Sequence, residues 1–340
     1  MGYKRGEGPV KKRQRRAQRM WIVGVFLLPV ALGVIPDVPH PFLNLFLWWV
    51  PPPPRVEVPA PLPGVERVLV IAPHPDDELL ALGGTIAHLT EEGHQVLVVF
   101  VTNGDANRAA KQVFTLNPLR RAEDYRALGY RRQKEAAAAL RVLGVPKSAA
   151  IFLGYPDQGL TALGTENWER ENPYPSPYTQ ANYPFYRNSF SLTAMYCGED
   201  LVADLATILD LFSPTVIYLP HPEDGHPDHR AAAQLTLIAL LRGEVKDDPE
   251  LRLYLVHAPS WPAPRRLAMD LALTVPTALD PWEWRSHELT EELIGLKLRA
   301  IQAYSSQRIT SGRFLASFVR PNEVYAVSTA SALPGGPVPR

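Results

Sequence analysis

Val-Leu-Val-Ile-Ala-Pro-His-Pro-Asp-Asp-Glu, at positions 68–78, joins a run of apolar residues directly to a histidine and three carboxylic acids. A second apolar run, Val-Ile-Tyr-Leu at 216–219, precedes the motif His-Pro-Asp-His at 226–229. Continuous apolar runs of this length are typical of strands buried on both faces of a parallel sheet. Because ligands bind beyond the carboxyl ends of such strands, we expect both motifs to lie in one crevice.

The body of the chain alternates apolar strands with helices, which predicts an α/β fold with a Rossmann-like, mostly parallel sheet flanked by helices. We assign this domain to residues 66–330. We expect strands at 66–72, 95–102, 149–153, 215–219 and 252–257, and helices at 79–92, 120–143, 199–212, 228–241 and 287–304.

Residues 160–197 interrupt this alternation with a segment rich in Pro, Tyr, Asn and Trp. Long loops in compact domains tend to be lids or binding loops. The aromatic side chains can stack on sugar rings or close over the site, and plain structural packing is the alternative.

The amino terminus differs from the body in charge. Its first 20 residues hold eight of the 35 Lys and Arg residues and only one of the 35 acids, so the rest of the chain is net acidic. An acidic body argues against nucleic acid as a partner. The single cysteine, Cys197, allows no internal disulfide.

A basic tail at 1–19 is followed by an apolar segment at 20–50 and a proline-rich linker at 51–65. This order predicts an N-terminal membrane segment before the domain. A signal anchor, a cleaved signal peptide and an interfacial or hairpin segment remain alternatives. With the basic tail in the cytoplasm, a single span makes the protein membrane-anchored and places the catalytic domain outside the cytoplasm.

The residue types at the two strand exits indicate a metal site. Imidazoles and carboxylates suit a borderline divalent cation such as zinc, held with one position open for water. His226 and His229 are three residues apart in a turn that enters a helix, so both can face the same space. A metal with an open position can generate hydroxide near neutral pH, which indicates a hydrolase.

These motifs resemble the LmbE/PIG-L family of zinc-dependent N-acetylglucosamine deacetylases. The resemblance is carried by Ala-Pro-His-Pro-Asp-Asp-Glu at 72–78 and Gly-His-Pro-Asp-His-Arg at 225–230. Weaker echoes are Leu-Gly-Tyr-Pro-Asp at 153–157, Arg132 with Glu135 before Leu-Gly-Val at 143–145, and Ala-Tyr-Ser-Ser-Gln at 303–307. The resemblance spans roughly residues 66–325.

The resemblance implies a role for each matching residue. His74, Asp77 and His229 would hold the zinc ion, and Asp76 would be the general base that deprotonates the attacking water. His226 would stabilise the oxyanion and could protonate the leaving amine.

Three further residues are expected around this centre. Asp228 would orient a histidine ring. Arg132 is expected to contact substrate, with a solvated helix residue paired with Glu135 or a neighbour as the alternative. Asp157 is expected to line the sugar pocket or to cap a turn.

The resulting expectation is a membrane-tethered, zinc-dependent enzyme that removes acetyl from an N-acetylglucosamine-type sugar or glycoconjugate. An amidase on the same scaffold, acting on a thiol-sugar conjugate or another N-acyl group, is one alternative. A carbohydrate-binding module without turnover is the other, and the additional carboxylate of Asp76 speaks against it.

Overall fold

The centre of the protein is a seven-stranded sheet with the order β3-β2-β1-β4-β5-β7-β6. The structure is a computed structural model that describes residues 64–328 except 117, 118, 120, 244–247, 277, 278, 280 and 281. The strands are β1 Arg67–Ala72, β2 Gln95–Thr102, β3 Ala150–Tyr155, β4 Val216–Pro220, β5 Glu250–Tyr254, β6 Trp284–Glu288 and β7 Asn322–Ser328. The helices are α3 Asp77–Glu91, α4 Arg108–Thr115, α5 Ala122–Val142, α6 Leu160–Leu163, α7 Gly198–Phe212, α8 Pro227–Arg242, α9 Glu291–Ala303 and α10 Ser305–Ala316, with a 3-10 turn at Lys147–Ala149.

Five neighbouring strands, β3 to β5, run parallel. The last two strands of the sheet do not follow this direction: β7 runs antiparallel to β5, and β6 runs antiparallel to β7. The predicted α/β fold with a mostly parallel sheet flanked by helices is therefore confirmed. The two antiparallel strands at one edge were not predicted.

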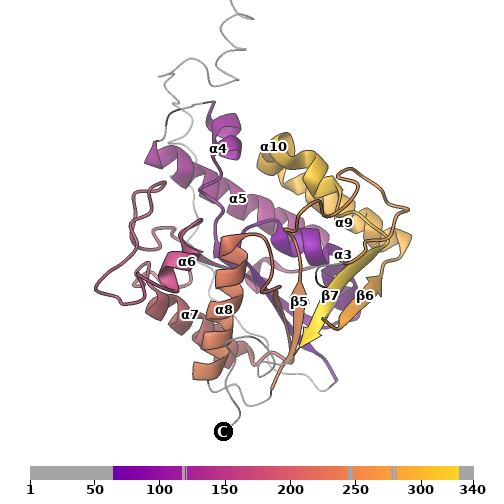
Figure 1. Cartoon of the computed structure of the whole chain (residues 1–340), viewed down its shortest axis with the longest axis horizontal. Helices are drawn as coiled ribbons and strands as arrows, with labels where there is room; N and C mark the ends of the chain where they lie inside the picture. The colour runs from indigo at the N-terminus through magenta and orange to yellow at the C-terminus, as the bar shows by residue number, and fades with distance from the viewer. Residues whose placement is uncertain are drawn as a thin grey trace, which may run out of the picture.

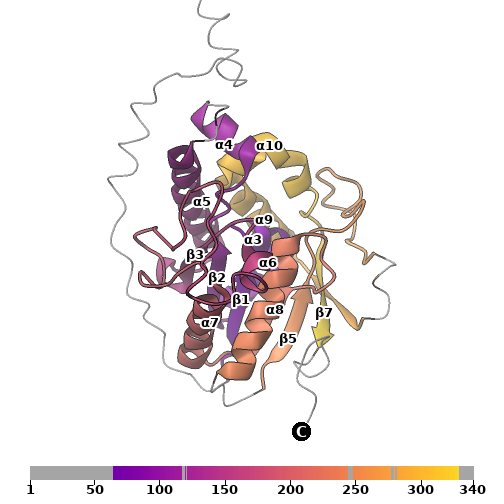
Figure 2. The same ribbon diagram turned by 60° about the vertical axis from the view of Figure 1, so that its left-hand side comes forward.

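Helices cover both faces of the sheet (Figure 1). Alternate residues of β1 point to opposite faces, so Val68 and Val70 pack with α3, α5 and α9. Leu69 and Ile71 pack with α6, α7 and α8 on the other face. Figure 2 shows α6, α7 and α8 together in front of the strands. Burial on both faces explains why β1 reads as an uninterrupted apolar run.

The strand order reverses at β1. The chain proceeds from β1 to β2 and β3 on one side, but β4 pairs with the other side of β1. Connections that leave neighbouring strands in opposite directions open a crevice at the carboxyl ends of those strands. The segments that follow β1 and β4 begin at this crevice, and they carry the two histidine motifs.

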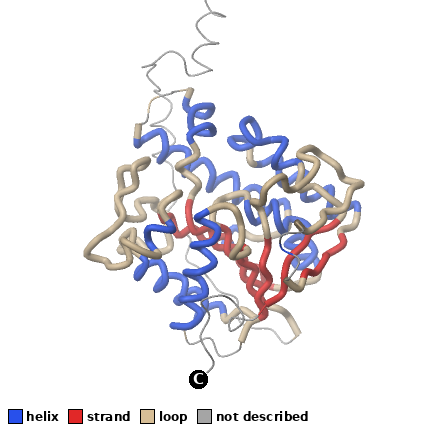
Figure 3. The backbone as a smooth tube through the Cα atoms, in the orientation of Figure 1, coloured by secondary structure: helices blue, strands red, loops and turns tan. Residues whose placement is uncertain are grey.

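The predicted aromatic insertion is largely an irregular segment between α6 and α7 (Figure 3). It folds back on the sheet edge, where the Phe190 N–H donates to the Phe152 carbonyl of β3 over 2.9 Å. Tyr186 is fully buried, and its hydroxyl donates to Asp105 Oδ2 over 2.5 Å. The segment is thus held against the strand ends.

The prediction of a membrane-anchored protein with an extracytoplasmic catalytic domain is contradicted. Among the described residues between 64 and 328, no helix combines the length and apolar character needed to cross a membrane. A bilayer core requires about 20 consecutive, mainly apolar helical residues. The longest described helix, α5, has 21 residues but includes Asp124, Arg132 and Glu135. The predicted membrane contact is withdrawn, and segments 1–19, 20–50 and 51–63 lie outside the described residues.

A buried ion pair ties α9 and β7 to α3. The Lys297 ammonium and the Glu323 carboxylate are 2.6 Å apart, with exposed side-chain fractions of 1% and 0%. The carboxylate also accepts the backbone N–H groups of Gly84 and Thr85 over 2.8 and 2.7 Å. The Glu323 carboxylate therefore neutralises the Lys297 ammonium and accepts two backbone N–H groups in the middle of α3.

Glu323→Gln should lower the free energy of unfolding by about 3–5 kcal/mol, because the buried Lys297 ammonium loses its countercharge. Urea unfolding measures this change. The matched control is Glu283→Gln, which breaks an exposed pair with Arg285 and should cost about 0–1 kcal/mol. Equal stability of the two variants would contradict the role of the buried pair.

Candidate metal centre and active site

Three of the predicted residues meet around one carboxylate oxygen. Asp77 Oδ2 lies 3.2 Å from His74 Nδ1 and 3.1 Å from His229 Nε2. The rings of His74 and His229 have centroids 5.4 Å apart. His74 follows β1, Asp77 begins α3, and His229 lies in the first turn of α8. The reversal of strand order thus brings together side chains that are more than 150 residues apart in sequence.

The distances from Asp77 Oδ2 to the two imidazole nitrogens suit ligands of one metal ion. The triads of described residues whose ligand atoms all lie within 4.8 Å of one another are His74–His226–His229, Asp77–His229–His257 and His74–Asp157–Asp228. Tetrahedral coordination at zinc–nitrogen and zinc–oxygen distances near 2.1 Å separates neighbouring ligand atoms by about 3.4 Å. His229 is fully buried, yet neither of its ring nitrogens makes a hydrogen bond of acceptable geometry to another described residue. Burying a polar atom without a partner is costly. A cation between Asp77 and His229 would satisfy Nε2, so the residues present fit a divalent metal.

The charges of the cluster favour a cation. Burial alone disfavours the ionised form of Asp77, but His229 holds the pKa of Asp77 well below its usual range. Burial alone would lower the pKa of His229, but Asp77 and Asp224 raise that pKa to about 9. The site therefore stabilises positive charge at His229, which a divalent metal can supply in place of the proton.

The opposite edge of the His74 ring faces two carboxylates. His74 Nε2 lies 3.3 Å from Asp157 Oδ1 and 3.3 Å from Asp228 Oδ2. Asp228 also accepts the N–H groups of Gln158 and Leu160 over 2.6 and 3.2 Å. Asp228 therefore contacts a histidine ring, and its task of orienting that ring stays a prediction. These contacts leave His74 Nδ1 facing Asp77.

Asp224 was missed from the sequence, although it lies two residues before His226. Its Oδ2 is 3.4 Å from His229 Nδ1 and accepts the N–H groups of Val256 and His257, each over 2.9 Å. Its Oδ1 accepts the His226 N–H over 2.8 Å. This buried carboxylate therefore joins the segment after β5 to the histidine motif and orients the His229 ring.

Asp76 occupies a strained backbone conformation next to the metal cluster. Its φ of 124° is unusual for a residue other than glycine, and such strain is concentrated at functional sites. The Asp76 N–H donates to Glu78 Oε2 over 3.0 Å, and Glu78 Oε1 accepts the Tyr304 hydroxyl over 2.6 Å. Burial raises the pKa of Asp76 to about 7 and that of Glu78 to about 8. Glu78 and Tyr304 hold the backbone that carries Asp76.

Arg132 contacts this same loop from α5. Its guanidinium donates to the Gly104 carbonyl over 2.8 Å and also to the Pro75 carbonyl, and Nη2 lies 3.3 Å from Asp76 Oδ1. Arg132 is buried and is not the solvated partner of Glu135, whose neighbour is Arg131. In this structure it orients Asp76, and its predicted contact with substrate stays a prediction.

His226 presents a ring nitrogen to the pocket. It caps the start of α8, and its Nδ1 accepts the Asp228 N–H over 3.2 Å. A neutral ring that accepts at Nδ1 carries its proton on Nε2. Burial lowers the pKa of His226 to about 4, so the ring is neutral and Nε2–H is a hydrogen-bond donor.

His257 was also missed, although it follows β5 as the other site residues follow their strands. One ligand atom each of His257, His229 and Asp77 lies within 4.8 Å of the others. The His257 ring stacks on Phe314 with centroids 5.6 Å apart. Its place three residues after Tyr254, at the carboxyl end of a parallel strand, is the sequence signal that would have identified it.

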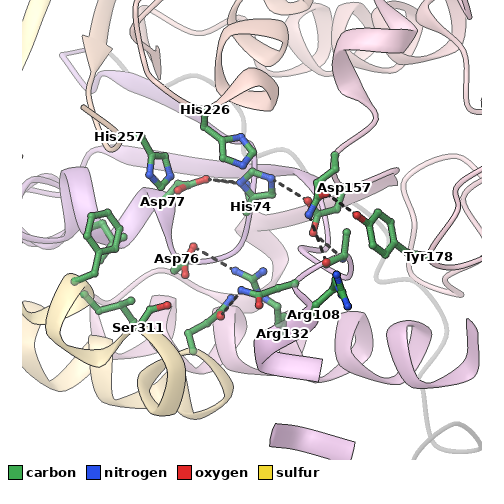
Figure 4. Close-up of a pocket in the computed structure, with 17 residues that line it drawn as sticks. His74, Asp76, Asp77, Arg108, Arg132, Asp157, Tyr178, His226, His257 and Ser311 are labelled. Carbon is green, nitrogen blue, oxygen red and sulfur yellow. Dashed lines mark hydrogen bonds and ion pairs between the residues drawn. The ribbon is translucent and has the colours of Figure 1, made fainter. Parts of the chain in front are cut away.

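A pocket of about 370 Å³ opens over these residues, a size suited to a small ligand (Figure 4). Besides His74 and Asp77, its lining includes Asp76, Arg132, Asp157, His226 and His257, and further out Asn107, Arg108, Gln158, Tyr178, Gln307, Ser311 and Phe314. The contact of Asp157 with a sugar stays a prediction. His229 and Asp228 are not in the lining; they lie behind it, next to Asp77 and His74 respectively.

Comparisons with known proteins show which family and which proteins this chain is similar to. The family model described as PIG-L: GlcNAc-PI de-N-acetylase matches residues 69–240. A 1D-myo-inositol 2-acetamido-2-deoxy-alpha-D-glucopyranoside deacetylase of Mycobacterium sp. (strain KMS) is 32% identical over 53% of this chain and 52% of its own length. A diacetylchitobiose deacetylase of Thermococcus kodakarensis is 28% identical over 53% of this chain and 51% of its own length. The chain thus spans about half the length of these curated relatives.

Among solved structures, the fold is similar to that of the N,N'-diacetylchitobiose deacetylase from Pyrococcus horikoshii. The TM-score is 0.50 and the identity is 20%, and the match covers 86% of this chain and 95% of the other. At this identity the likeness shows the fold alone.

Asp224→Asn should weaken binding of Zn²⁺ by roughly 10- to 100-fold, because His229 loses the charged group that orients it. Asparagine keeps one oxygen that can still accept the N–H groups of Val256 and His257, while its amide nitrogen faces the His226 N–H, so urea unfolding is measured beside the affinity to check that the variant is folded. Competition with a chromophoric chelator measures the affinity. Glu223→Gln is the control, since Glu223 contacts the Trp282 indole and not His229. Unchanged affinity in Asp224→Asn would contradict this role.

Proposed function

Because the chain belongs to the PIG-L family of GlcNAc-PI de-N-acetylases, we propose that it is a zinc-dependent hydrolase that removes the N-acetyl group from an N-acetylglucosamine-type sugar or glycoconjugate. The observation that carries the proposal is the placement of His74 and His229 around Asp77 Oδ2, with His74, Asp76 and Asp77 lining one pocket. The named activities of the similar proteins, both deacetylases of acetamido sugars, support it.

His74, Asp77 and His229 would hold the zinc ion. When bound, zinc polarises an acyl carbonyl and lowers the pKa of water. Two imidazoles and one carboxylate form a typical donor set for a catalytic zinc, which leaves room for water and substrate.

Asp76 acts as general base in this proposal. It lies next in sequence to Asp77, and Arg132 fixes one oxygen of its carboxylate over 3.3 Å. It takes a proton from the attacking water and holds it until the departing amine nitrogen needs one. The C–N bond breaks, and the products are acetate and the amino sugar.

His226 stabilises the negative oxygen that develops on the acyl carbon. Its Nδ1 is occupied by the Asp228 N–H, so its ring proton lies on Nε2. Because the Nε2–H donor is already oriented before the reaction, the site does not have to rearrange as negative charge develops on the oxygen.

The strained backbone at Asp76 favours catalysis over binding alone. A carbohydrate-binding module has no need of an additional carboxylate held at a φ of 124° beside the metal ligands. An amidase acting on a thiol-sugar conjugate would use the same residues, so a substrate panel is the test between the two.

Purified protein should release acetate from at least one N-acetylated sugar, with N-acetylglucosamine, N,N'-diacetylchitobiose and an N-acetylglucosaminyl-inositol as the first panel. Treatment with a chelator should abolish the release, and added Zn²⁺ should restore it, because the three ligands would hold the ion reversibly. Coupled detection of acetate measures the rate. Turnover that persists without metal, or that occurs only with N-acyl compounds lacking a sugar, would contradict the proposal.

Asp76→Asn should lower kcat by about 10²–10⁴-fold, because asparagine cannot take the proton. Zinc content should stay unchanged, since Asp76 is not among the proposed ligands; atomic absorption measures it. Asp270→Asn, an exposed carboxylate outside the pocket lining, is the matched control and should keep full turnover. Intact turnover in Asp76→Asn would remove its role as base.

A further inference from the structure

The aromatic insertion contacts the elements that build the active site through the side chain of Tyr186. This side chain is fully buried, and its ring packs edge to face on Tyr130 of α5, with centroids 4.8 Å apart. It fits there because Gly129 carries no side chain: a Cβ at Gly129 would collide with the hydroxyl and the ring of Tyr186. Helix α5 therefore offers a slot for one tyrosine, three residues before Arg132.

This slot places the Tyr186 hydroxyl on a buried carboxylate. The hydroxyl donates to Asp105 Oδ2 over 2.5 Å, and Asp105 is only 1% exposed. The other carboxylate oxygen, Oδ1, makes no hydrogen bond to any residue that the structure describes. Because burying a carboxylate without a donor is costly, the Tyr186 hydroxyl stabilises Asp105 in this position.

Asp105 belongs to a short segment after β2 that contacts two residues of the pocket. Directly before it, the Gly104 carbonyl accepts a hydrogen bond from the Arg132 guanidinium over 2.8 Å. Directly after it, the Ala106 N–H donates to Asp157 Oδ2 over 2.7 Å. Three consecutive residues thus contact Arg132, the insertion and Asp157 in turn.

Arg132 connects this segment to the proposed base. Its guanidinium donates to the carbonyls of Gly104 and Pro75, and Nη2 lies 3.3 Å from Asp76 Oδ1. Gly104 has a φ of 60°, and a Cβ there would overlap the Arg132 guanidinium. The two groups are in such close contact that a shift of Gly104 moves the guanidinium, and with it the partner of the Asp76 carboxylate.

We propose that Tyr186 is a positioning residue for the reaction: it fixes the segment from Gly104 to Ala106 and, through Arg132, sets the place of Asp76. The insertion thereby acts on catalysis, although Tyr186 is not among the residues that line the pocket. This inference rests on the proposed function. It gives the insertion a task that differs from closing over the site or stacking on a sugar.

Tyr186→Phe tests the proposal, because phenylalanine keeps the ring in its slot and loses only the hydroxyl. It should lower kcat for the best sugar of the acetate-release panel roughly 10-fold, with KM and zinc content unchanged. Gly129→Ala should give a similar loss, since its methyl group displaces the hydroxyl from Asp105.

Tyr155→Phe is the matched control. The Tyr155 hydroxyl also donates to a buried carboxylate, Asp204 Oδ2 over 2.9 Å, but this pair lies in the core beneath α7 and outside the pocket lining. Urea unfolding should show similar losses of stability in the two phenylalanine variants, and Tyr155→Phe should keep full turnover. Equal kcat in the two variants would therefore show that the Tyr186 hydroxyl has only a structural role.

A double-mutant cycle tests whether the effect passes through the base. In a chain that carries Asp76→Asn, Tyr186→Phe should leave the residual turnover unchanged, because the base that Tyr186 positions is already gone. A further roughly 10-fold loss in that chain, or an unchanged kcat in Tyr186→Phe alone, would overturn the proposal.

Crystal structures of the zinc-loaded chain with and without Tyr186→Phe separate this inference from the proposed function. Loss of the hydroxyl should displace Gly104 and turn the Arg132 guanidinium away from Asp76. A guanidinium that keeps its place would overturn the inference without any measurement of turnover. Absence of acetate release from every sugar of the panel would instead refute the proposed function.

Discussion

The site depends on one carboxylate oxygen, Asp77 Oδ2, which lies about equally far from His74 Nδ1 and His229 Nε2. This arrangement requires that the segments after β1 and β4 be neighbours, and the reversal of strand order at β1 makes them so. Three further carboxylates contact the two histidine rings from the side opposite Asp77. Asp157 and Asp228 face the far edge of His74, and Asp224 faces the far edge of His229.

The central fold could be predicted because burial on both faces leaves a plain signal. β1 and β4 are continuous apolar runs, and a histidine motif begins two residues after β1 and six residues after β4. The predicted metal residues His74, Asp77 and His229 meet for the same reason, since the carboxyl ends of parallel strands share one edge. The position of each motif after a strand predicted a shared crevice, and the resemblance to the LmbE/PIG-L family implied which of its residues would be the ligands.

The remaining features are properties of tertiary packing that leave little local signal. The edge strand β6 has the mostly exposed sequence Trp-Arg-Ser-His-Glu, so the predicted helix at 287–304 began too early and α9 starts at Glu291. Asp224 and Glu78 resemble solvated acids in sequence, yet both are fully buried and serve as acceptors for backbone groups. Arg132 directs donors at a carbonyl of the protein and at Asp76, contacts that its place in a helical stretch of sequence did not indicate.

The metal ligands that follow β1 and the proposed base differ in what holds them in place. His74 and Asp77 need only the turn after β1, whose hydrogen bond from the His74 N–H to Asp77 Oδ2 is local. Asp76 instead needs a strained φ, a conformation that costs about 1–3 kcal/mol and persists only where neighbours impose it. Those neighbours are Arg132 from α5 and, through Glu78, Tyr304 at the junction of α9 and α10. The position of the proposed base is therefore set by the assembled domain, so mutations in α5 or near α10 can impair catalysis while the metal cluster stays intact.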